Sequence, residues 1–310
     1  MKTVFMGTPD FAVEALQALY DNGHRIELVV TQPDKPVGRS GKLKAPPVKE
    51  RAMGLGLTVE QPVKASDPVF IKKIRDIDPD VIVVVAYGQI LKKEFLNIPK
   101  YGCVNIHASL LPKYRGAAPI QWSVINGDEM TGVTTMLMDE GVDTGDILLT
   151  EKVRLAPKET GGSLFDKLSR TGAELIIRTL DELESGSIKP VSQDNEKATH
   201  AGMLSKEMGR IDFNNDALTL ERLIRGLNPW PGAYTYLDGK KLTLWDADVG
   251  GVVDEAVEPG TLTGVGKDSI EICCRDSVLI VKELQLEGKK RMRVGDFLNG
   301  HKLTVGEKLG

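Results

Sequence analysis

The chain has 310 residues, of which 41% are hydrophobic and 27% charged, and its formal net charge is −4. This length and composition predict a globular protein of two domains, and the negative charge excludes a protein that binds nucleic acid through its overall charge. We find no apolar run long enough for a signal peptide or a membrane span, so we expect a cytoplasmic protein without membrane contact. Its three cysteines form no Cys-x-x-Cys pair, which argues against a disulfide framework and a zinc site.

The first half of the chain alternates predicted strands and helices. Asp67-Pro68 has the N-cap and first-turn proline of a helix, and the apolar run at residues 81–86 that follows is typical of a central strand covered on both faces. This alternation predicts a doubly wound, mainly parallel, Rossmann-like α/β sheet. Strands are expected at residues 3–6, 26–31, 81–86, 103–107 and 132–138, and helices after residues 10 and 67 and at residues 163–185.

A polar loop rich in proline and glycine is expected from Gln32 to about Pro47. Residues 34–51 contain six lysines and arginines against two acidic residues, and residues 289–293 (KKRMR) contain four basic residues in five. A basic run of this kind is either a solvated surface or a local site for a polyanion. Loops as long as the first one are often functional.

The second part of the chain has a different pattern. After a polar stretch at residues 186–207 and a helix near residues 217–227, short alternating strands follow, and Asp238-Gly239 between two of them predicts a hairpin. This pattern predicts a small antiparallel, OB-like β-barrel. The expected division is a first domain at 1–189, a linker at 190–206 and a second domain at 207–310.

Asn105 and His107 lie two positions apart at the end of a predicted strand. They therefore point to the same face, at the sheet edge where doubly wound folds bind ligands. An amide can donate a hydrogen bond to a developing oxyanion, and an imidazole can carry a proton near neutral pH. The alternative is a pair of polar side chains with structural partners only.

Two loops accompany this pair. Residues 109–116 (SLLPKYRG) place two leucines beside a proline, where they either fill the core or form the wall of a slot for a flat heterocycle. Residues 139–146 (DEGVDTGD) form an acidic, glycine-rich loop, one of whose carboxylates could reach His107 and favour its protonated form. Such loops also bind metals, but the other ligands are missing.

These motifs resemble the 10-formyltetrahydrofolate-dependent formyltransferases. The Asn-x-His-x-Ser-Leu-Leu-Pro-x-x-x-Gly motif of that family spans Asn105 to Gly116, and its Asp-Thr-Gly-Asp element spans Asp143 to Asp146. The segments FMGTPDFA (residues 5–12) and NPWPGA (residues 228–233) are similar to those members that formylate methionyl-tRNA. The likeness covers essentially the whole chain.

The resemblance implies roles for particular residues. Asn105, His107 and Asp143 would be catalytic, and Ser109, Leu110, Leu111 and Pro112 would line the folate site. The pterin pocket would be shaped by the stretch that contains Gln89, Ile90 and Leu91. The co-substrate would be 10-formyltetrahydrofolate, with no metal.

The resemblance also implies an RNA partner. Initiator methionyl-tRNA would be held by Arg39, Lys42 and Lys44 of the basic loop and by residues 289–293 of the second domain, and we expect a monomer. The main rival is a sibling enzyme that formylates a sugar nucleotide or another small amine, such as glycinamide ribonucleotide; the basic loop argues against it. A hydrolase of the same folate, a nicotinamide dehydrogenase and a non-enzymatic RNA-binding protein are further alternatives. The first turn lacks the Gly-x-Gly-x-x-Gly of the dehydrogenases.

Overall fold

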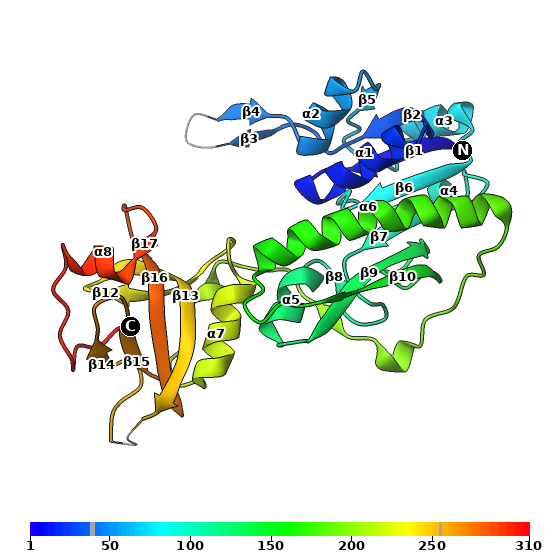
Figure 1. Ribbon diagram of the computed structural model, residues 1–310. Helices are drawn as coiled ribbons and strands as arrows, with labels where there is room; N and C mark the ends of the chain where they lie inside the picture. The colour runs from blue at the N-terminus through cyan, green and yellow to red at the C-terminus, as the bar shows by residue number, and fades with distance from the viewer. Residues whose placement is uncertain (38–40, 254–255) are drawn as a thin grey trace. The chain divides into compact units, whose positions relative to one another are not determined.

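The computed structural model describes residues 1–37, 41–253 and 256–310 of the chain. The chain forms two compact units, each with its own β-sheet (Figure 1). The first unit comprises residues 1–116, 130–154 and 165–201. The second comprises residues 117–129, 155–164 and 202–310.

The first unit contains a seven-stranded sheet in the order β10-β9-β7-β6-β1-β2-β5. The five strands from β7 to β5 pair in parallel, whereas β9 runs antiparallel to β7 and β10 antiparallel to β9. The strands are β1 (Lys2–Gly7), β2 (Arg25–Val30), β5 (Val59–Glu60), β6 (Val81–Val85), β7 (Cys103–His107), β9 (Met130–Leu137) and β10 (Ile147–Arg154). The prediction of a mainly parallel, doubly wound sheet is therefore confirmed, although the strand β10 was not predicted.

Helices cover both faces of this sheet, and α1 and α6 lie over the same face (Figure 1). On the other face, α3 and α4 pack Phe70, Ile74 and Phe95 against alternate residues of β1 and β6. The Asp67 side chain caps α3, as its sequence predicts, by accepting hydrogen bonds from the amides of Val69 and Phe70. The helical segments are η1 (Asp10–Ala12), α1 (Val13–Asp21), α2 (Pro47–Gly54), α3 (Pro68–Ile77), α4 (Lys93–Leu96), α6 (Gly161–Ser185) and η2 (Asn195–Lys197).

Close packing of α6 fixes the orientation of β7. A Cβ atom at Gly172 would lie 2.9 Å from Cγ2 of Ile106, so the helix and the strand can approach this closely only because residue 172 is glycine. Ile106 points toward α6. Because strand residues alternate, Asn105 and His107 point to the opposite face.

The basic loop after β2 contains regular structure that its sequence did not predict. β3 (Lys35–Val37) and β4 (Lys42–Lys44) form a two-stranded antiparallel hairpin, which extends away from the sheet of the first unit (Figure 1). The prediction of a loop without strands from Gln32 to about Pro47 is therefore wrong, because this range contains β3 and β4. The hairpin was not predicted because short exposed strands such as Lys42–Lys44 leave little hydrophobic signal in the sequence.

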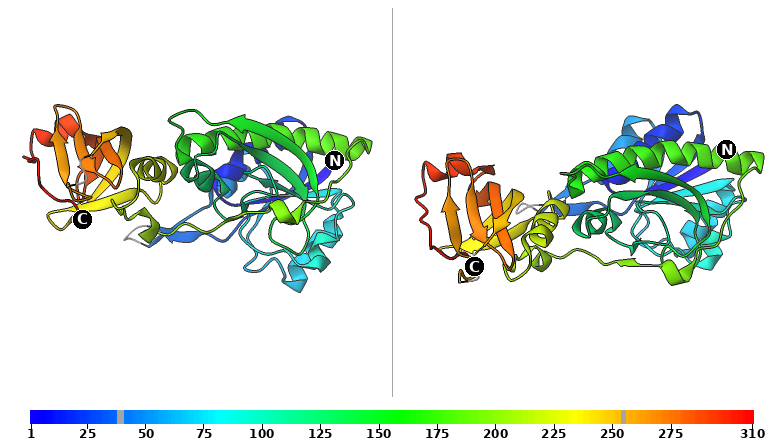
Figure 2. Two further views of the ribbon diagram at one scale, coloured as in Figure 1. Left: turned by 90° about the horizontal axis from the view of Figure 1, so that it is seen from below. Right: turned by 60° about the horizontal axis from the view of Figure 1, so that its bottom comes forward.

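The second unit contains an antiparallel sheet in the order β12-β13-β16-β15-β14, with β17 also paired to β16 (Figures 1 and 2). The sheet curls around one hydrophobic core, to which α7 and α8 contribute. The chain's last residues hydrogen-bond to both edges, since the amide of Leu309 donates to Gly260 before β14 and the amide of Gly310 donates to Tyr236 of β12. The elements are α5 (Pro119–Ile125), η3 (Glu207–Gly209), α7 (Ala217–Gly226), β12 (Ala233–Leu237), β13 (Lys240–Val252), β14 (Leu262–Val265), β15 (Ile270–Cys273), β16 (Ser277–Leu286), β17 (Met292–Arg293) and α8 (Val294–Leu298).

Asp238-Gly239 forms the hairpin turn that was predicted. Both residues have positive φ angles, 49° and 74°, and β12 and β13 pair on either side of them. Such a turn follows the twist of the two strands. The two short strands β8 (Arg115–Gly116) and β11 (His200–Ala201) pair in parallel in the first unit.

A buried carboxylate joins two segments of the second unit. Glu221 of α7 is 4% exposed and accepts hydrogen bonds from Arg225, at 2.7 and 2.9 Å, and from Lys158, at 2.8 Å. Burial raises the pKa of Glu221, but the hydrogen bonds from Arg225 and Lys158 outweigh this effect and hold the pKa below its usual value. The ionised carboxylate therefore stabilises the fold.

Glu221→Gln is expected to lower the free energy of unfolding by about 3 kcal/mol at pH 7, because it leaves the largely buried Arg225 guanidinium without its counter-charge, whereas Lys158 keeps its ion pair with Asp248. Since the folded-state pKa is depressed, this contribution is present above the unfolded-state pKa and is lost as the pH falls through the folded-state pKa. Urea denaturation of both proteins from pH 7 to pH 3 measures the difference. Glu258→Gln, which removes an exposed ion pair with Lys308, is the control and should change the free energy of unfolding far less, because solvent screens an exposed pair. An equal effect of the two substitutions would contradict the account.

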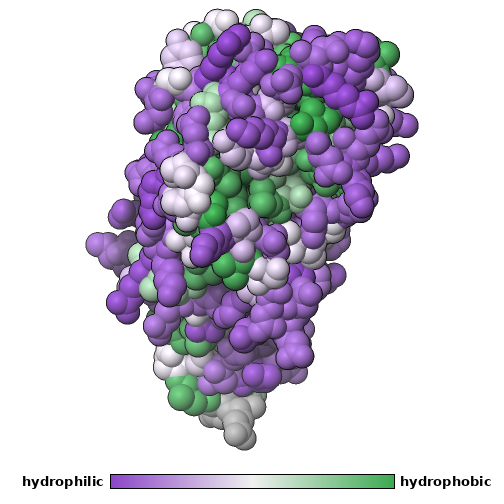
Figure 3. Space-filling model, turned by 90° about the vertical axis from the view of Figure 1, so that its right-hand side faces the viewer, coloured by the Kyte–Doolittle hydropathy of each residue, from purple (hydrophilic) through white to green (hydrophobic). Residues whose placement is uncertain are grey.

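Hydrophilic side chains occupy most of the face drawn in Figure 3, with hydrophobic residues between them. Among the described residues, we find no helix that combines the length and the apolar character needed to cross a membrane.

Candidate active site

Asn105 and His107 share one face at the end of β7, as predicted. Asn105 is half-buried, and within the described ranges its side-chain amide makes no hydrogen bond to the protein. His107 is 6% exposed. A half-buried amide without a protein partner can donate to a ligand at no cost to the fold, because no internal hydrogen bond has to break.

Two neighbours fix the His107 ring. Nε2 lies 2.9 Å from the carbonyl oxygen of Tyr114, and Nδ1 lies 3.6 Å from Oδ2 of Asp143. A carbonyl can only accept, so Nε2 carries a hydrogen atom and donates it to Tyr114. Nδ1 is left as the nitrogen that faces Asp143.

Asp143 is the acidic-loop residue whose carboxylate comes to His107. The other acids of the loop have different surroundings: Asp139 accepts hydrogen bonds from Gly141 and Thr144, Asp146 accepts one from Ser192, and Glu140 is exposed. Oδ2 of Asp143 also accepts a hydrogen bond of 2.8 Å from the Gly116 amide. The carboxylate is thus positioned by the two loops that follow β7 and β9.

The path of the acidic loop differs from that of a loop in a wholly parallel sheet. β9 is antiparallel to β7, with Leu137 beside Val104 and Thr134 beside His107, so the loop leaves the sheet beside the start of β7 and has to turn back to reach His107. Gly145 permits the return, because a Cβ there would lie 1.7 Å from the Leu137 carbonyl oxygen. Asp143 adopts a left-handed backbone conformation, with φ of 53°.

The predicted folate residues occupy different environments. Ser109 is fully buried and donates a 2.6 Å hydrogen bond to the Lys113 carbonyl, so its hydroxyl closes the loop. Leu111 is buried, whereas Leu110 and Pro112 are half-buried. Of the two alternatives that the sequence left open, Leu111 therefore fits the core and Leu110 fits an accessible wall.

The predicted pterin residues divide in the same way. The Gln89 amide accepts a hydrogen bond from the Ala65 amide and donates one to the Val63 carbonyl, while Leu91 lies in the core. Ile90 is 78% exposed. Of these three residues, Ile90 is the apolar side chain free to contact a ligand.

The predicted RNA contacts lie on exposed segments. Lys42 and Lys44 are exposed on β4 of the hairpin, and Arg39 lies outside the described residues. In the second unit, Lys289 and Lys290 are exposed, and the Arg291 guanidinium lies over the Trp245 ring and pairs with Glu283.

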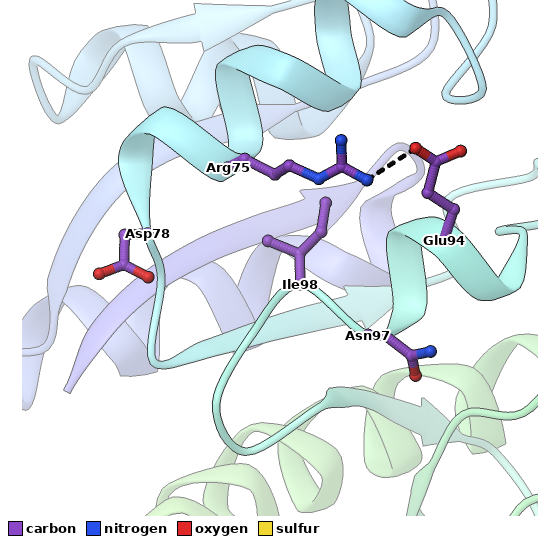
Figure 4. Close-up of a pocket in the computed structure, with 5 residues that line it drawn as sticks. All are labelled: Arg75, Asp78, Glu94, Asn97 and Ile98. Carbon is purple, nitrogen blue, oxygen red and sulfur yellow. Dashed lines mark hydrogen bonds and ion pairs between the residues drawn. The ribbon is translucent and has the colours of Figure 1, made fainter.

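A separate pocket lies at the amino ends of β6 and β7. Arg75 and Glu94 form an ion pair across it, and Asp78, Asn97 and Ile98 complete its lining (Figure 4). Ligands of doubly wound sheets bind at the carboxyl ends of strands, so this pocket is not the active site. In the described part of the chain, no cluster of three or more His, Cys, Asp or Glu side chains could hold a metal.

The sequence did not reveal that Arg115 and Gln193 bind each other and that Gln193 binds the acidic loop. Arg115 is 6% exposed and donates to the Gln193 side-chain oxygen from Nε (3.0 Å) and Nη2 (2.7 Å). Gln193 lies in the polar stretch between the two predicted domains, where periodicity gives no signal. A glutamine in such a stretch is ordinarily read as solvated surface.

Comparisons with known proteins identify the family of the chain. A family model described as formyl transferase matches residues 1–180, and one described as formyl transferase, C-terminal domain, matches residues 203–302. A protein of Lachnospira eligens named methionyl-tRNA formyltransferase is 57% identical over the whole of both chains. One of Agathobacter rectalis with the same name is 55% identical over 99% of this chain and 98% of its own.

A solved structure shows the same fold at low identity. It is that of WlaRD, a sugar 3N-formyl transferase in the presence of dTDP and 5-N-formyl-THF, with a TM-score of 0.66 and 18% identity over 94% of this chain and 99% of its own. The family models and these relatives show a group-transfer enzyme, and its first unit contains the doubly wound sheet. The chain belongs to the formyl transferase family.

Proposed function

We propose that this enzyme transfers the formyl group of 10-formyltetrahydrofolate to the α-amino group of initiator methionyl-tRNA, giving N-formylmethionyl-tRNA for translation initiation. The observation that carries the proposal is the 57% identity, along the whole of both chains, to a protein named methionyl-tRNA formyltransferase. The likeness to the sugar enzyme, at 18% identity, extends to the fold alone.

The residues of the site fit this co-substrate, because the free Asn105 amide is a donor for a carbonyl oxygen. The co-substrate supplies a formyl group on N10. The α-amine of an aminoacyl ester is much less basic than a lysine and is partly unprotonated at neutral pH, so it can attack the formyl carbon without a covalent enzyme intermediate. As the new C–N bond forms, negative charge develops on the formyl oxygen.

Asn105 and His107 stabilise that charge in the proposed mechanism. Nδ2 of Asn105 donates one hydrogen bond to the oxygen. Because Nε2 of His107 donates to Tyr114, the second hydrogen bond would come from Nδ1, the ring nitrogen that faces Asp143. Asp143, acting through water, helps to move the proton from the attacking nitrogen to N10 as the C–N10 bond breaks.

We further propose the roles of the remaining segments. Residues 1–189 would be catalytic, residues 190–206 would connect the domains, and residues 207–310 would contact tRNA through Lys289–Arg293. Leu110 and Ile90 would border the folate, and the hairpin with Lys42 and Lys44, together with Arg39, would contact the acceptor arm. The protein would act in the cytoplasm as a monomer.

Lys42→Ala and Lys44→Ala are each expected to reduce the dependence of tRNA affinity on salt, by about one unit in the slope of log Kd against log salt concentration. Both lysines are exposed on β4, where they can meet phosphates. Filter binding of methionyl-tRNA at several salt concentrations measures the slope. Lys72→Ala is the matched control, since Lys72 is exposed and paired with Asp76 on α3. An unchanged slope in both hairpin variants would remove these lysines from the interface.

The function is tested by transfer of labelled formyl from 10-formyltetrahydrofolate to three acceptors: charged initiator methionyl-tRNA, free methionine and an amino sugar nucleotide. The label should appear in the tRNA alone. Transfer to the sugar nucleotide with an equal or greater kcat/KM would favour the sibling activity.

A further inference from the structure

Residues 191–201 contact two loops of the first unit, the loop at residues 109–116 and the acidic loop at residues 139–146. Val191 forms two backbone hydrogen bonds with Ile147, of 2.8 and 2.9 Å. The carbonyl of Thr199 accepts from the Arg115 amide at 2.8 Å, and its hydroxyl accepts from the Tyr114 amide at 2.9 Å. We call residues 191–201 the crossing segment. It touches the loop that binds His107 and the start of the strand that follows the acidic loop.

Gln193 is the residue of this segment that contacts the backbone of the catalytic carboxylate. Its Nε2 donates to the carbonyl oxygens of Asp143, at 2.9 Å, and Gly145, at 2.7 Å. Its Oε1 accepts both hydrogen bonds from Arg115. All of its four hydrogen-bonding positions are used, and the Arg115 donors and the two carbonyl acceptors permit only one orientation of the amide.

The conformation of Asp143 explains why such support is needed. A non-glycine residue with φ of 53° is strained by about 1–3 kcal/mol, and such a residue persists only where its surroundings hold it. Gln193 binds the carbonyl oxygen of this residue, and Gly116 binds its carboxylate. The backbone and the side chain of Asp143 are therefore fixed from two separate segments.

Gln193 also satisfies hydrogen-bond donors of the Arg115 guanidinium. This guanidinium is buried, and in the described part of the chain its hydrogen bonds go to the neutral side chains of Gln193 and Asn195. A buried charge is costly unless its donors are satisfied. Arg115 thus fixes the Gln193 oxygen, and its neighbour Gly116 binds the Asp143 carboxylate.

We propose that Gln193 is a positioning residue for formyl transfer: it joins Arg115 to the acidic loop and holds Asp143 in the conformation that faces Nδ1 of His107. The inference rests on the proposed function. It gives Gln193, which lies in the proposed connection at residues 190–206, a role in positioning a catalytic residue.

Two substitutions separate positioning from stability. Gln193→Glu keeps the size of the side chain and its bonds to Arg115, but it replaces two donors by an acceptor that repels the Asp143 and Gly145 carbonyls. Gln193→Ala removes both sets of bonds. We expect both variants to lose about 10- to 100-fold in kcat with KM nearly unchanged, the effect of misplacing a catalytic group by about 1 Å, and only Gln193→Ala to lower Tm.

Ser192→Ala is the matched control. Ser192 is adjacent and donates to the Asp146 side chain, so its loss leaves the Asp143 backbone contacts intact. Retention of more than a third of wild-type kcat by Gln193→Glu, or an equal loss in Ser192→Ala, would overturn the inference.

Hydrogen exchange of the amides at residues 143–146 provides a readout that does not depend on activity. Exchange should accelerate in both Gln193 variants and stay unchanged in Ser192→Ala; unchanged exchange in Gln193→Glu would overturn the positioning role. A wild-type protein that transfers no formyl group would instead contradict the proposed function, and the exchange measurement would still decide the role of Gln193.

Discussion

Asn105→Ala is expected to lower kcat for formyl transfer by about 10²- to 10³-fold, the usual effect of removing one donor from an oxyanion site. The Asn105 side chain makes no hydrogen bond to the described part of the protein, so its removal should leave the fold intact. The KM values for both substrates should change little, because the hydrogen bond strengthens as charge develops on the formyl oxygen. Steady-state kinetics with methionyl-tRNA at saturating folate measures both parameters.

A matched control for this substitution is Asn97→Ala. Asn97 is an exposed asparagine at the amino ends of β6 and β7, in the pocket drawn in Figure 4. Its substitution should leave kcat unchanged. A loss of less than about fivefold in Asn105→Ala would remove Asn105 from the oxyanion site, since a single donor there is worth about 3 kcal/mol.

Asp143→Asn is expected to lower kcat by about 10²- to 10⁴-fold, the range for removal of a group that transfers protons. The substitution changes charge while keeping shape: the asparagine oxygen can still accept from the Gly116 amide, and asparagine tolerates the left-handed conformation of this position. Melting temperature should therefore be close to that of the wild type. The loss would report the charge that faces Nδ1 of His107.

Asp139→Asn serves as the control for charge in the same loop. Asp139 is exposed and accepts hydrogen bonds from Gly141 and Thr144, which asparagine can also accept. It should retain most of the activity. If Asp143→Asn kept more than about a third of wild-type kcat, the carboxylate would have no part in moving the proton.

Much of the sheet could be predicted because its central strands are mostly apolar. The strand at residues 103–107 was predicted with the bounds that the structure has, and β6 differs by one residue. Period-two alternation then placed Asn105 and His107 on one face. The turn at Asp238-Gly239 was equally local, since a positive φ at both positions selects these residue types.

The antiparallel strand β10 could not be predicted from the same signals. Its residues alternate between half-buried or buried and exposed positions, in the sequence ILLTEKVR, and the strand lies at the edge of the sheet beside β9. Edge strands have little apolar character to distinguish them from loops. Its direction depends on the return of the acidic loop, which is a tertiary property.

The hydrogen bonds by which Gln193 supports the Asp143 loop could not be predicted from the sequence either. Gln193 follows Asp143 by 50 residues, and its partners are backbone carbonyls, which have no sequence identity of their own. The resemblance identified Asp143, but a single glutamine in a polar stretch carries no periodicity or spacing that could connect it to that loop. Only the path of the chain brings the two together.

The most direct test of the account is a crystal structure of this protein with a 10-formyl folate analogue that cannot transfer its formyl group. If Asn105 and His107 form the oxyanion site, the formyl oxygen will lie at about 2.7–3.1 Å from Nδ2 of Asn105 and within hydrogen-bond reach of His107. A folate whose formyl group lies away from the end of β7, with both side chains outside hydrogen-bond distance, would contradict it.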